Sequence, residues 1–340
     1  MDRKHIKYLE IKAYSGYNPS KGKIACAKKH EYFIKTDITI SGDAPKDLIR
    51  YYQYDGICKK VNPKSWDLYI AKHGEKHYPN EVITEYLLNR IGEVLGFNMA
   101  KSKLLILGGQ IRFLSKYFLD IYNNQALEHG ADLYAGFLND KNFVEEIERQ
   151  HQSTNFFTVQ FTEQTFQHLF PEYWENLMLD FLKLLILDGI IGNNDRHFYN
   201  WGIVRNLKQQ TAPSFSPIYD TARGLFWNDD DNKIKSIYQD KKRLENYIEK
   251  YCEHCYPKIG WEGQSKPNHF QLIKNICKMD ILEQNCDFLK SICSNKMLNK
   301  VFRMIDNEFS LLMTSQRISL IKTVIQYRFN RIQNFITFAP

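Results

Sequence analysis

The chain has 340 residues, of which 43% are hydrophobic, 14% aromatic and 25% charged. These values are typical of a globular protein and exclude a disordered, collagen-like or coiled-coil chain. The 46 Lys and Arg outnumber the 39 Asp and Glu by only seven and lie in mixed-sign patches, which does not favour nucleic acid as the main partner.

The first part of the chain carries strand signals. Three short apolar runs are bounded by turn residues: WDLYIAK (Trp66 to Lys72), KSKLLIL (Lys101 to Leu107) and QIRFLSKYFL (Gln110 to Leu119). A Gly-Gly pair joins the last two as a hairpin. Between the first two runs, apolar residues recur at helical spacing behind Pro79 and stop at Gly96. These patterns predict an antiparallel sheet that carries one amphipathic helix.

A lysine ends the apolar face of the first of these strands. Alternation along WDLYIAK puts Lys72 on the same side as three apolar residues, so the lysine needs an anionic partner. Glu85 follows thirteen residues later on the predicted helix. A strand lysine that pairs with a helix glutamate and holds the α/β-phosphates is the protein-kinase arrangement. Taken alone, Lys72 also fits a lysine that snorkels to solvent, and Glu85 an exposed helix residue.

After about residue 120 the pattern becomes helical, with segments around Ala131 to Glu148, Glu172 to Ile190, and several from about Asp240 to Ile336. The segment ENLMLDFLKLLILDGIIG is apolar on nearly all faces, which predicts a helix at the centre of its lobe. We therefore expect a bilobal α+β fold. An N-terminal antiparallel sheet lobe with one helix (residues 1–120) would face a larger helical C-terminal lobe (residues 121–340) across a cleft.

A polar stretch, GNNDRHFYNWGIV, follows this buried helix directly. In it, Asp195 and Asn200 are five residues apart. Phosphoryl transfer uses this spacing when one loop offers a carboxylate to the attacking hydroxyl and an amide oxygen to Mg²⁺. Asp220 follows an apolar Pro-Ile-Tyr twenty residues beyond Asn200, and the oxygens of both would suit Mg²⁺ or Mn²⁺. Each residue alone fits a turn, a cap or a solvated side chain; together they favour a site.

Cysteine usage and apolar runs bear on location. Cys252 and Cys255 have the spacing of half a zinc site, but no second pair follows, which favours a helix with two half-buried thiols. Seven cysteines, an odd number, indicate reduced thiols, and the first residues contain no apolar signal core. The richest apolar run, Leu184 to Ile191, contains Asp188 and is too short to span a membrane. We therefore expect a cytoplasmic protein with no membrane partner.

Four segments of the sequence, in their relative positions, resemble the HipA-type serine/threonine kinase family, including its compact single-domain members. They are GNNDRHFYNWG, PIYD, YIAK and NEVITEYLLNRIGEVLGFN. The resemblance extends from about residue 54 to 225, and its most specific element is N-x-D-R-H-x-x-N-W-G followed by Tyr-Asp. It implies a kinase that uses ATP and Mg²⁺ to phosphorylate serine or threonine of a protein, itself included. Its implied residues are Asp195 as the catalytic aspartate, Asn200 and Asp220 as magnesium ligands, Lys72 as the phosphate-binding lysine and Glu85 as its partner.

The resemblance has further implications. His197 matches the loop histidine of the family, which we expect to hold the loop by hydrogen bonds, and we expect a structural or phosphate-facing role for Arg196. Members of the family act as toxins or effectors. A regulatory or antitoxin protein is therefore an implied partner, and the cytoplasm in question is either that of the producer or that of a host cell.

Two features depart from the family pattern. We expect the chain to lack the N-terminal subdomain that HipA-type toxins usually carry. The phosphate-covering loop should be rich in glycine or serine, but Ile40 to Gly56 offers only Ser41, Gly42 and Gly56. The amides around Gly42 are our candidate phosphate cradle, and Ser41 is a candidate autophosphorylation site. We expect adenine to bind the backbone near Tyr117 to Asp120.

Two other functions are consistent with the same residues. The acceptor could be a lipid or a small molecule, although the dispersed charge disfavours membrane substrates. The poverty of glycine in the phosphate loop is instead compatible with a catalytically weak nucleotide-binding module that acts by protein interaction. The presence of Lys72, Asp195, Asn200 and Asp220 favours an active protein kinase.

Overall fold

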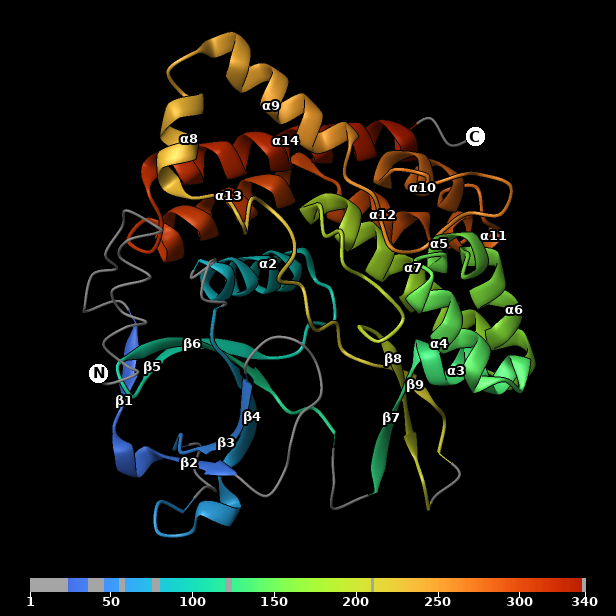
Figure 1. Ribbon diagram of the computed structural model, residues 1–340, viewed down its shortest axis with the longest axis horizontal. Helices are drawn as coiled ribbons and strands as arrows, with labels where there is room; N and C mark the ends of the chain where they lie inside the picture. The colour runs from blue at the N-terminus through green and yellow to red at the C-terminus, as the bar shows by residue number, and fades with distance from the viewer. Residues whose placement is uncertain are drawn as a thin grey trace.

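The computed structural model describes residues 24–35, 46–54, 59–74, 80–119, 124–208 and 211–337. The chain forms two lobes: a curled sheet with one helix beside it, and a larger assembly of helices (Figure 1). This is the bilobal α+β fold that the sequence predicts.

The N-terminal sheet has six strands in the order β1-β5-β6-β4-β3-β2 among the described residues. Neighbouring strands are antiparallel except for β1, which runs parallel to β5, so the sheet is mixed rather than wholly antiparallel. The three residues of β1 are too few for a strand signal to be read from the sequence. The strands are β1 (Ala25–Ala27), β2 (Tyr32–Lys35), β3 (Lys46–Tyr51), β4 (Asp67–Lys72), β5 (Ser102–Leu107) and β6 (Gln110–Lys116).

The two faces of β4 have different surroundings. Tyr69 and Ala71 belong to a small core that also contains Ile49 and Leu114. Because successive side chains of a strand point to opposite faces, Lys72 lies on the other face, toward helix α2. The strand pattern thereby aims a lysine at the region between the lobes.

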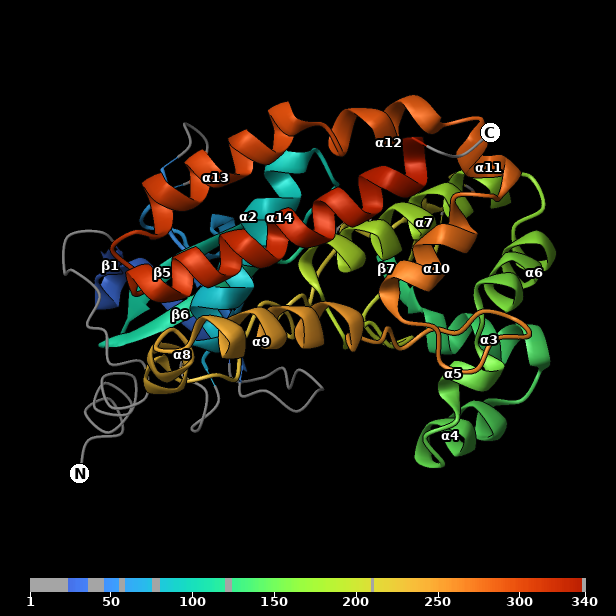
Figure 2. The same ribbon diagram turned by 90° about the horizontal axis from the view of Figure 1, so that it is seen from above.

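Helix α2 (Glu81–Leu95) joins the two lobes. Its apolar stripe is buried in the main core, and Gly96 ends the helix with a left-handed φ of 86°. It packs against β5 and β6 on one side and α13 (Asn295–Phe309) on the other. Figures 1 and 2 show α2 between the sheet and the helices of the C-terminal lobe. The buried stripe consists of Val82, Ile83, Leu87, Leu88, Ile91 and Leu95.

The C-terminal lobe combines helices with a small three-stranded sheet of order β7-β8-β9. Its strands are β7 (Gln125–His129), β8 (Gly202–Asn206) and β9 (Ser214–Phe215). Its helices, besides α13, are α3 (Gly130–Leu138), α4 (Lys141–Arg149), α5 (Ser153–Phe156), α6 (Val159–Leu169), α7 (Trp174–Ile191), α8 (Asp231–Ile237), α9 (Lys241–Glu253), α10 (His269–Ile276), α11 (Asp280–Glu283), α12 (Cys286–Ile292) and α14 (Ser315–Thr337).

Helix α7 lies at the centre of this lobe, as its apolar sequence predicts. It is packed by α6, α10, α11 and α14, and Figure 2 shows the long α14 crossing above it. The helical region expected over 131–148 is divided into α3 and α4, because Asn139 takes a left-handed φ of 52° and Asp140 caps α4 through the Phe143 amide. The C-terminal end of α7 leads into the polar loop that the sequence singles out.

Within the described part of the chain, every helix is too short or too polar to cross a membrane.

Candidate active site

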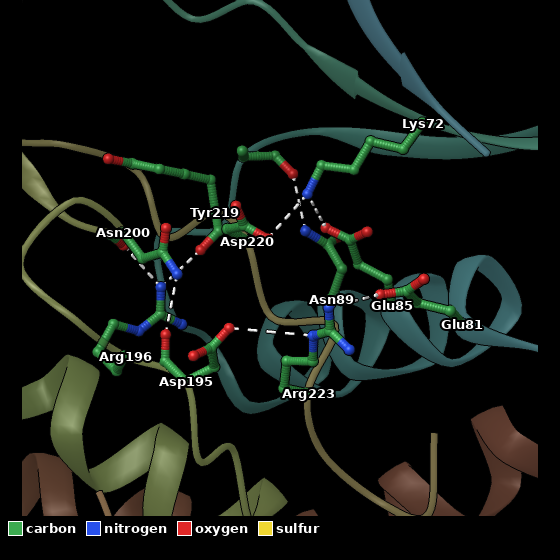
Figure 3. A network of polar contacts seen from close by, with 11 residues as sticks. Lys72, Glu81, Glu85, Asn89, Asp195, Arg196, Asn200, Tyr219, Asp220 and Arg223 are labelled. Atoms are coloured by element: carbon green, nitrogen blue, oxygen red, sulfur yellow. Dashed lines mark hydrogen bonds and ion pairs between the residues drawn. The ribbon is translucent and has the colours of Figure 1, made fainter. Parts of the chain in front are cut away.

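Lys72 lies between two carboxylates where the lobes meet (Figure 3). Its Nζ donates a hydrogen bond to Glu85 Oε1 at 2.7 Å and another to Asp220 Oδ1 at 2.9 Å. The Glu85 side chain is 2% exposed, whereas that of Asp220 is 36% exposed. The contact between Lys72 and Glu85 that the sequence predicts is therefore present, and Asp220 joins it from the other lobe.

The charges of this cluster depend on one another. Burial by itself would lower the pKa of the Lys72 amine, but the two carboxylates raise it above its ordinary value. Burial would raise the pKa of the Asp220 carboxyl, yet the charge and hydrogen bond of Lys72 lower it to about 2. For Glu85 burial outweighs the attraction of Lys72, and its pKa rises to about 7. Lys72 and Asp220 are thus charged at neutral pH, while Glu85 titrates near it.

The backbone around Asp220 is fixed by the chain that follows α2. The Ile218 amide donates to the Asn98 carbonyl at 2.7 Å, and the Ala100 amide donates to the Ile218 carbonyl at 2.9 Å. Asp220 itself has a φ of 55°, which is uncommon for a residue with a side chain. The pairing of residue 218 thus holds a strained turn that brings the Asp220 carboxylate to Lys72.

A buried ion pair lies beneath the polar loop. Arg196 donates to both carboxylate oxygens of Asp188 in α7, at 2.8 and 3.1 Å, and both side chains are 1% exposed. Arg196 Nη1 also donates to the carbonyls of Asn200, at 2.7 Å, and Tyr219, at 2.6 Å. One guanidinium therefore ties α7, the loop and the residue before Asp220 together. Of the two roles expected for Arg196, this is the structural one.

Hydrogen bonds within the loop set the positions of Asp195 and Asn200. Asn193 donates to Asp188 Oδ1 at 2.9 Å, and its own Oδ1 accepts from the Asp195 amide at 3.3 Å. Asn200 Nδ2 donates to the Asp195 carbonyl at 2.9 Å. These bonds occupy backbone groups and the Asn200 amide nitrogen. The Asp195 carboxylate is 38% exposed, which leaves it accessible from the solvent side.

His197 contacts neighbouring residues of the loop. Its Nδ1 accepts a hydrogen bond from the Tyr199 amide at 3.3 Å, and its own amide donates to the Asp195 carbonyl at 2.9 Å. Nearby, the Tyr219 hydroxyl donates to the Tyr199 carbonyl at 3.2 Å and lies 3.1 Å from His129 Nδ1. The side chain next to Asp220 is therefore anchored to the same loop.

Asn200 and Asp220 fit a hard divalent cation by the chemistry of their oxygens. The nitrogen of the Asn200 amide is committed to the Asp195 carbonyl, so the amide oxygen is the group that can face a cation. Asp220 uses Oδ1 for Lys72 and retains a second carboxylate oxygen. Amide and carboxylate oxygens, completed by phosphate oxygens and water, suit Mg²⁺.

The described residues contain no cluster of three or more His, Cys, Asp or Glu side chains that could hold a metal by themselves. Cys252 and Cys255 are free thiols, and both are fully buried rather than half-buried as expected. Cys255 Sγ donates to the Gly192 carbonyl at 3.2 Å, at the end of α7. The pair is therefore part of the packing behind the loop.

The apolar face of β4 beside Lys72, which the sequence predicts, extends onto the neighbouring strands. In the register of β3, β4 and β6, Leu48 lies opposite Ile70, and Ile70 lies opposite Ser115. Residues directly opposite one another share a face, so these three lie on the face of Lys72. This register places a largely apolar strip next to the charged cluster.

Several residues proposed for the nucleotide cannot be placed in the same way. Ser41 and Gly42, between β2 and β3 in the sequence, lie outside the described residues, and so do Gly56 after β3 and Asp120 after β6. The Tyr117 amide donates to the Leu68 carbonyl at 2.8 Å. It therefore extends the pairing of β4 and β6, and any contact of Tyr117 with adenine would use another of its groups.

Two charged residues of the site escape the sequence interpretation. Asp188 interrupts an apolar run in the sequence, and a carboxylate inside an otherwise apolar helix signals a buried cationic partner. Arg223 follows Asp220 by three residues, and its Nε lies 3.9 Å from Asp195 Oδ2. No spacing rule points to it.

Comparison with known proteins gives three similarities. The model of the HipA-like C-terminal domain family matches residues 38–279. The serine/threonine-protein kinase CtkA of Helicobacter pylori strain J99 is 24% identical over 248 residues, which cover 71% of this chain and 70% of CtkA.

Comparison with solved structures bears on the fold. The crystal structure of the Helicobacter pylori proinflammatory kinase CtkA aligns with a TM-score of 0.68 and 18% identity, over 91% of this chain and 97% of that one. HipA of Shewanella oneidensis MR-1, solved with HipB and operator DNA, aligns with a TM-score of 0.47 and 13% identity, over 88% of this chain and 66% of that one. The chain therefore shares its fold with CtkA.

Proposed function

The chain belongs to the HipA-like C-terminal domain family, and from this premise we propose that it is an ATP- and Mg²⁺-dependent kinase that phosphorylates serine or threonine of a protein, itself included. CtkA, its relative, is a serine/threonine-protein kinase by name. The same proposal includes a regulatory or antitoxin protein as the partner. It also includes a cytoplasmic location, either in the producer or in a host cell.

One observation carries the proposal. Lys72 contacts Glu85 and Asp220 at once, and Asn200 donates to the Asp195 carbonyl within the loop after α7. In protein kinases a strand lysine must pair with a helix glutamate, and an aspartate must hold the metal, before transfer is fast. The contact of Lys72 with Glu85 supports the first requirement, and the position of Asp220 beside Lys72 is compatible with the second.

The nucleotide side of the site follows from these contacts. Lys72 is charged and can turn from Asp220 to the α/β-phosphates while Glu85 keeps it in place. Asn200 and Asp220 would hold Mg²⁺, which when bound neutralises the charge that develops on the phosphates. The apolar strip of Leu48 and Ile70 beside Lys72 would lie against the adenine ring.

The acceptor side uses Asp195. The hydroxyl oxygen of the substrate forms a bond to the γ-phosphorus while the bond from that phosphorus to the bridging β,γ-oxygen breaks and ADP leaves. The Asp195 carboxylate orients the hydroxyl and accepts its proton. The hydrogen bonds of Asn193 and Asn200 hold the Asp195 backbone during this step, so that the carboxylate keeps its position.

The proposal is tested by incubating the protein with ATP and Mg²⁺, alone and with candidate protein acceptors, and measuring intact masses. We expect phosphate to be added by the wild type and not by Asp195→Ala, with both proteins equally folded by circular dichroism. Digestion then identifies the modified serine or threonine. Full transfer by Asp195→Ala would remove Asp195 from its assigned role.

The two alternatives give different results in the same experiment. A lipid or small-molecule kinase would phosphorylate inositol lipids or soluble alcohols and leave every protein unmodified. A nucleotide-binding module would bind ATP in calorimetry but transfer phosphate to no acceptor. Either result would contradict the proposed protein kinase.

A further inference from the structure

Arg223 lies between a carboxylate of each lobe (Figure 3). Its Nη2 is 3.7 Å from Glu81 Oε1 in α2, and its Nε is 3.9 Å from Asp195 Oδ2 in the loop. Both distances exceed those of a hydrogen-bonded ion pair, which are about 2.7–2.9 Å. The guanidinium therefore interacts with both carboxylates and is committed fully to neither.

The backbone that carries Arg223 is fixed. Its carbonyl accepts from the Asn194 amide at 3.2 Å, and a Cβ on Gly224 would lie 2.8 Å from the Ile191 carbonyl oxygen. The next two residues, Leu225 and Phe226, both have left-handed φ angles, of 46° and 63°. Such strain persists only where the surroundings determine the conformation. The freedom of this residue thus resides in its side chain.

Arg317 of α14 holds the far end of the same segment. It is 1% exposed, and its Nη1 donates to the Phe226 carbonyl at 3.1 Å while its Nε donates to Asp231 at 2.7 Å. The segment from Arg223 to Asp231 is therefore clamped at both ends. It cannot carry Arg223 toward or away from Asp195 without breaking these buried bonds.

The side chain of Arg223 packs against an aromatic ring. Its guanidinium carbon lies 3.9 Å from the centre of the Trp227 ring, which is a cation–π contact. The side chain is 29% exposed. A planar cation that rests on a ring can slide between two neighbouring acceptors at little cost, because the stacking contact is kept.

Helix α2 presents two carboxylates one turn apart. Glu85 pairs with Lys72, and Glu81, which is 6% exposed, faces Arg223. Burial and Asp220 raise the pKa of Glu85, and the charge of Glu81 raises it further, because the two carboxylates of the helix repel each other. Each carboxylate therefore needs its own cation. Lys72 links Glu85 to the nucleotide side of the site, and Arg223 links Glu81 to Asp195.

We propose that Arg223 is a positioning residue shared by Glu81 and Asp195, and that Glu81 draws Arg223 away so that the Asp195 carboxylate can accept the substrate proton. Without Glu81, Arg223 closes on Asp195 and forms a full ion pair, which blocks the approach of that carboxylate to the hydroxyl. The inference rests on the proposed function of Asp195. It makes Glu81 important for transfer although Glu81 contacts neither nucleotide nor acceptor.

The test compares Glu81→Gln, Arg223→Gln and the double variant in steady-state phosphoryl transfer. We expect Glu81→Gln to lower kcat about tenfold while KM for ATP changes by less than about twofold. Adding Arg223→Gln to Glu81→Gln should recover most of the lost kcat, because the competing cation is gone. Glu93→Gln, on the same helix but facing Arg90, is the matched control and should leave kcat unchanged.

Suppression is the result that a structural role alone would not produce. A double variant that is slower than Glu81→Gln would overturn the inference, as would a loss with Glu93→Gln equal to that with Glu81→Gln. If Glu81→Gln does not fold, Glu81→Asp retracts the charge by one methylene and should give a smaller loss of the same sign.

A crystal structure of Glu81→Gln provides a readout that needs no activity. We expect Arg223 Nε within about 3 Å of Asp195 Oδ2 in that variant. An unchanged distance would refute the inference even if the protein is a kinase. A wild type that transfers no phosphate while this distance shortens would instead refute the proposed function alone.

Discussion

The site has two Arg–Asp pairs that are built differently: a rear pair of Arg196 with Asp188 and a front pair of Arg223 with Asp195. At the rear, Arg196 and Asp188 are each 1% exposed and are joined by hydrogen bonds of 2.8 and 3.1 Å. At the front, Arg223 and Asp195 are 29% and 38% exposed and lie 3.9 Å apart. The same two residue types thus form a tight pair in one place and a loose one in the other.

The difference reflects what each pair has to do. A buried, multiply bonded pair fixes backbone geometry, because moving either partner leaves a charge without compensation. A partly exposed carboxylate with a loose partner can change its partner during a reaction. The rear pair therefore accounts for the shape of the loop, and the front pair leaves the Asp195 carboxylate accessible for the role proposed for it.

Breaking the rear pair should have the largest effect on stability. Arg196→Met leaves the Asp188 carboxylate buried without its cation and frees the Asn200 and Tyr219 carbonyls. We expect a loss of about 3–5 kcal/mol in the free energy of unfolding, measured by urea denaturation. Arg205→Met, which removes a half-exposed surface pair with Glu128, should change it by less than about 1 kcal/mol. Equal losses in both variants would contradict the comparison.

The cluster between the lobes should show an intermediate, pH-dependent effect. The pKa of Glu85 rises from its ordinary 4.5 to about 7 in the folded protein, so the folded state binds more protons between these values. The free energy of unfolding should then fall as pH rises from 4.5 to 7, by about 3 kcal/mol from this residue. Glu85→Gln should lack this part of the fall. Identical pH profiles for the two proteins would show that Glu85 is ordinarily ionised.

Changing the front residue should have the smallest effect on stability. Asp195→Asn keeps the backbone bonds to Asn193, His197 and Asn200 and removes only a partly exposed charge. We expect the free energy of unfolding to change by less than about 0.5 kcal/mol, while phosphoryl transfer falls at least about 100-fold. A large loss of stability would place Asp195 in the rear framework instead.

The features predicted from the sequence depend on the order of the elements and on the spacing of apolar residues along the chain. Strand alternation aims Lys72 at α2, helical spacing places Glu85 on the same side, and the buried α7 delivers the loop of Asp195 and Asn200. The positions of these residues are local features that a pattern along the chain is sufficient to find, whereas the pairing of Lys72 with Glu85 is predicted from the protein-kinase arrangement. The bilobal α+β fold follows from the same local signals.

The features that sequence reasoning misses depend on how the chain packs in three dimensions. The β1 strand forms only because β5, far along the chain, offers its edge. Asp188 and Arg196 find each other across the turn at the end of α7, and Arg223 meets Glu81 only when the lobes are packed. No periodicity encodes these contacts, because they are set by tertiary structure. Gly42, proposed for the phosphates, lies outside the described residues and stays a prediction.

The most direct test of the site as one phosphoryl-transfer centre compares two aspartates. Transfer from ATP in the presence of Mg²⁺ should be abolished by Asp220→Asn, which removes the carboxylate shared between Lys72 and the expected metal position. Asp306→Asn, an equivalent change on the exposed surface of α13, should transfer at the wild-type rate. Full transfer by a folded Asp220→Asn protein would contradict the account.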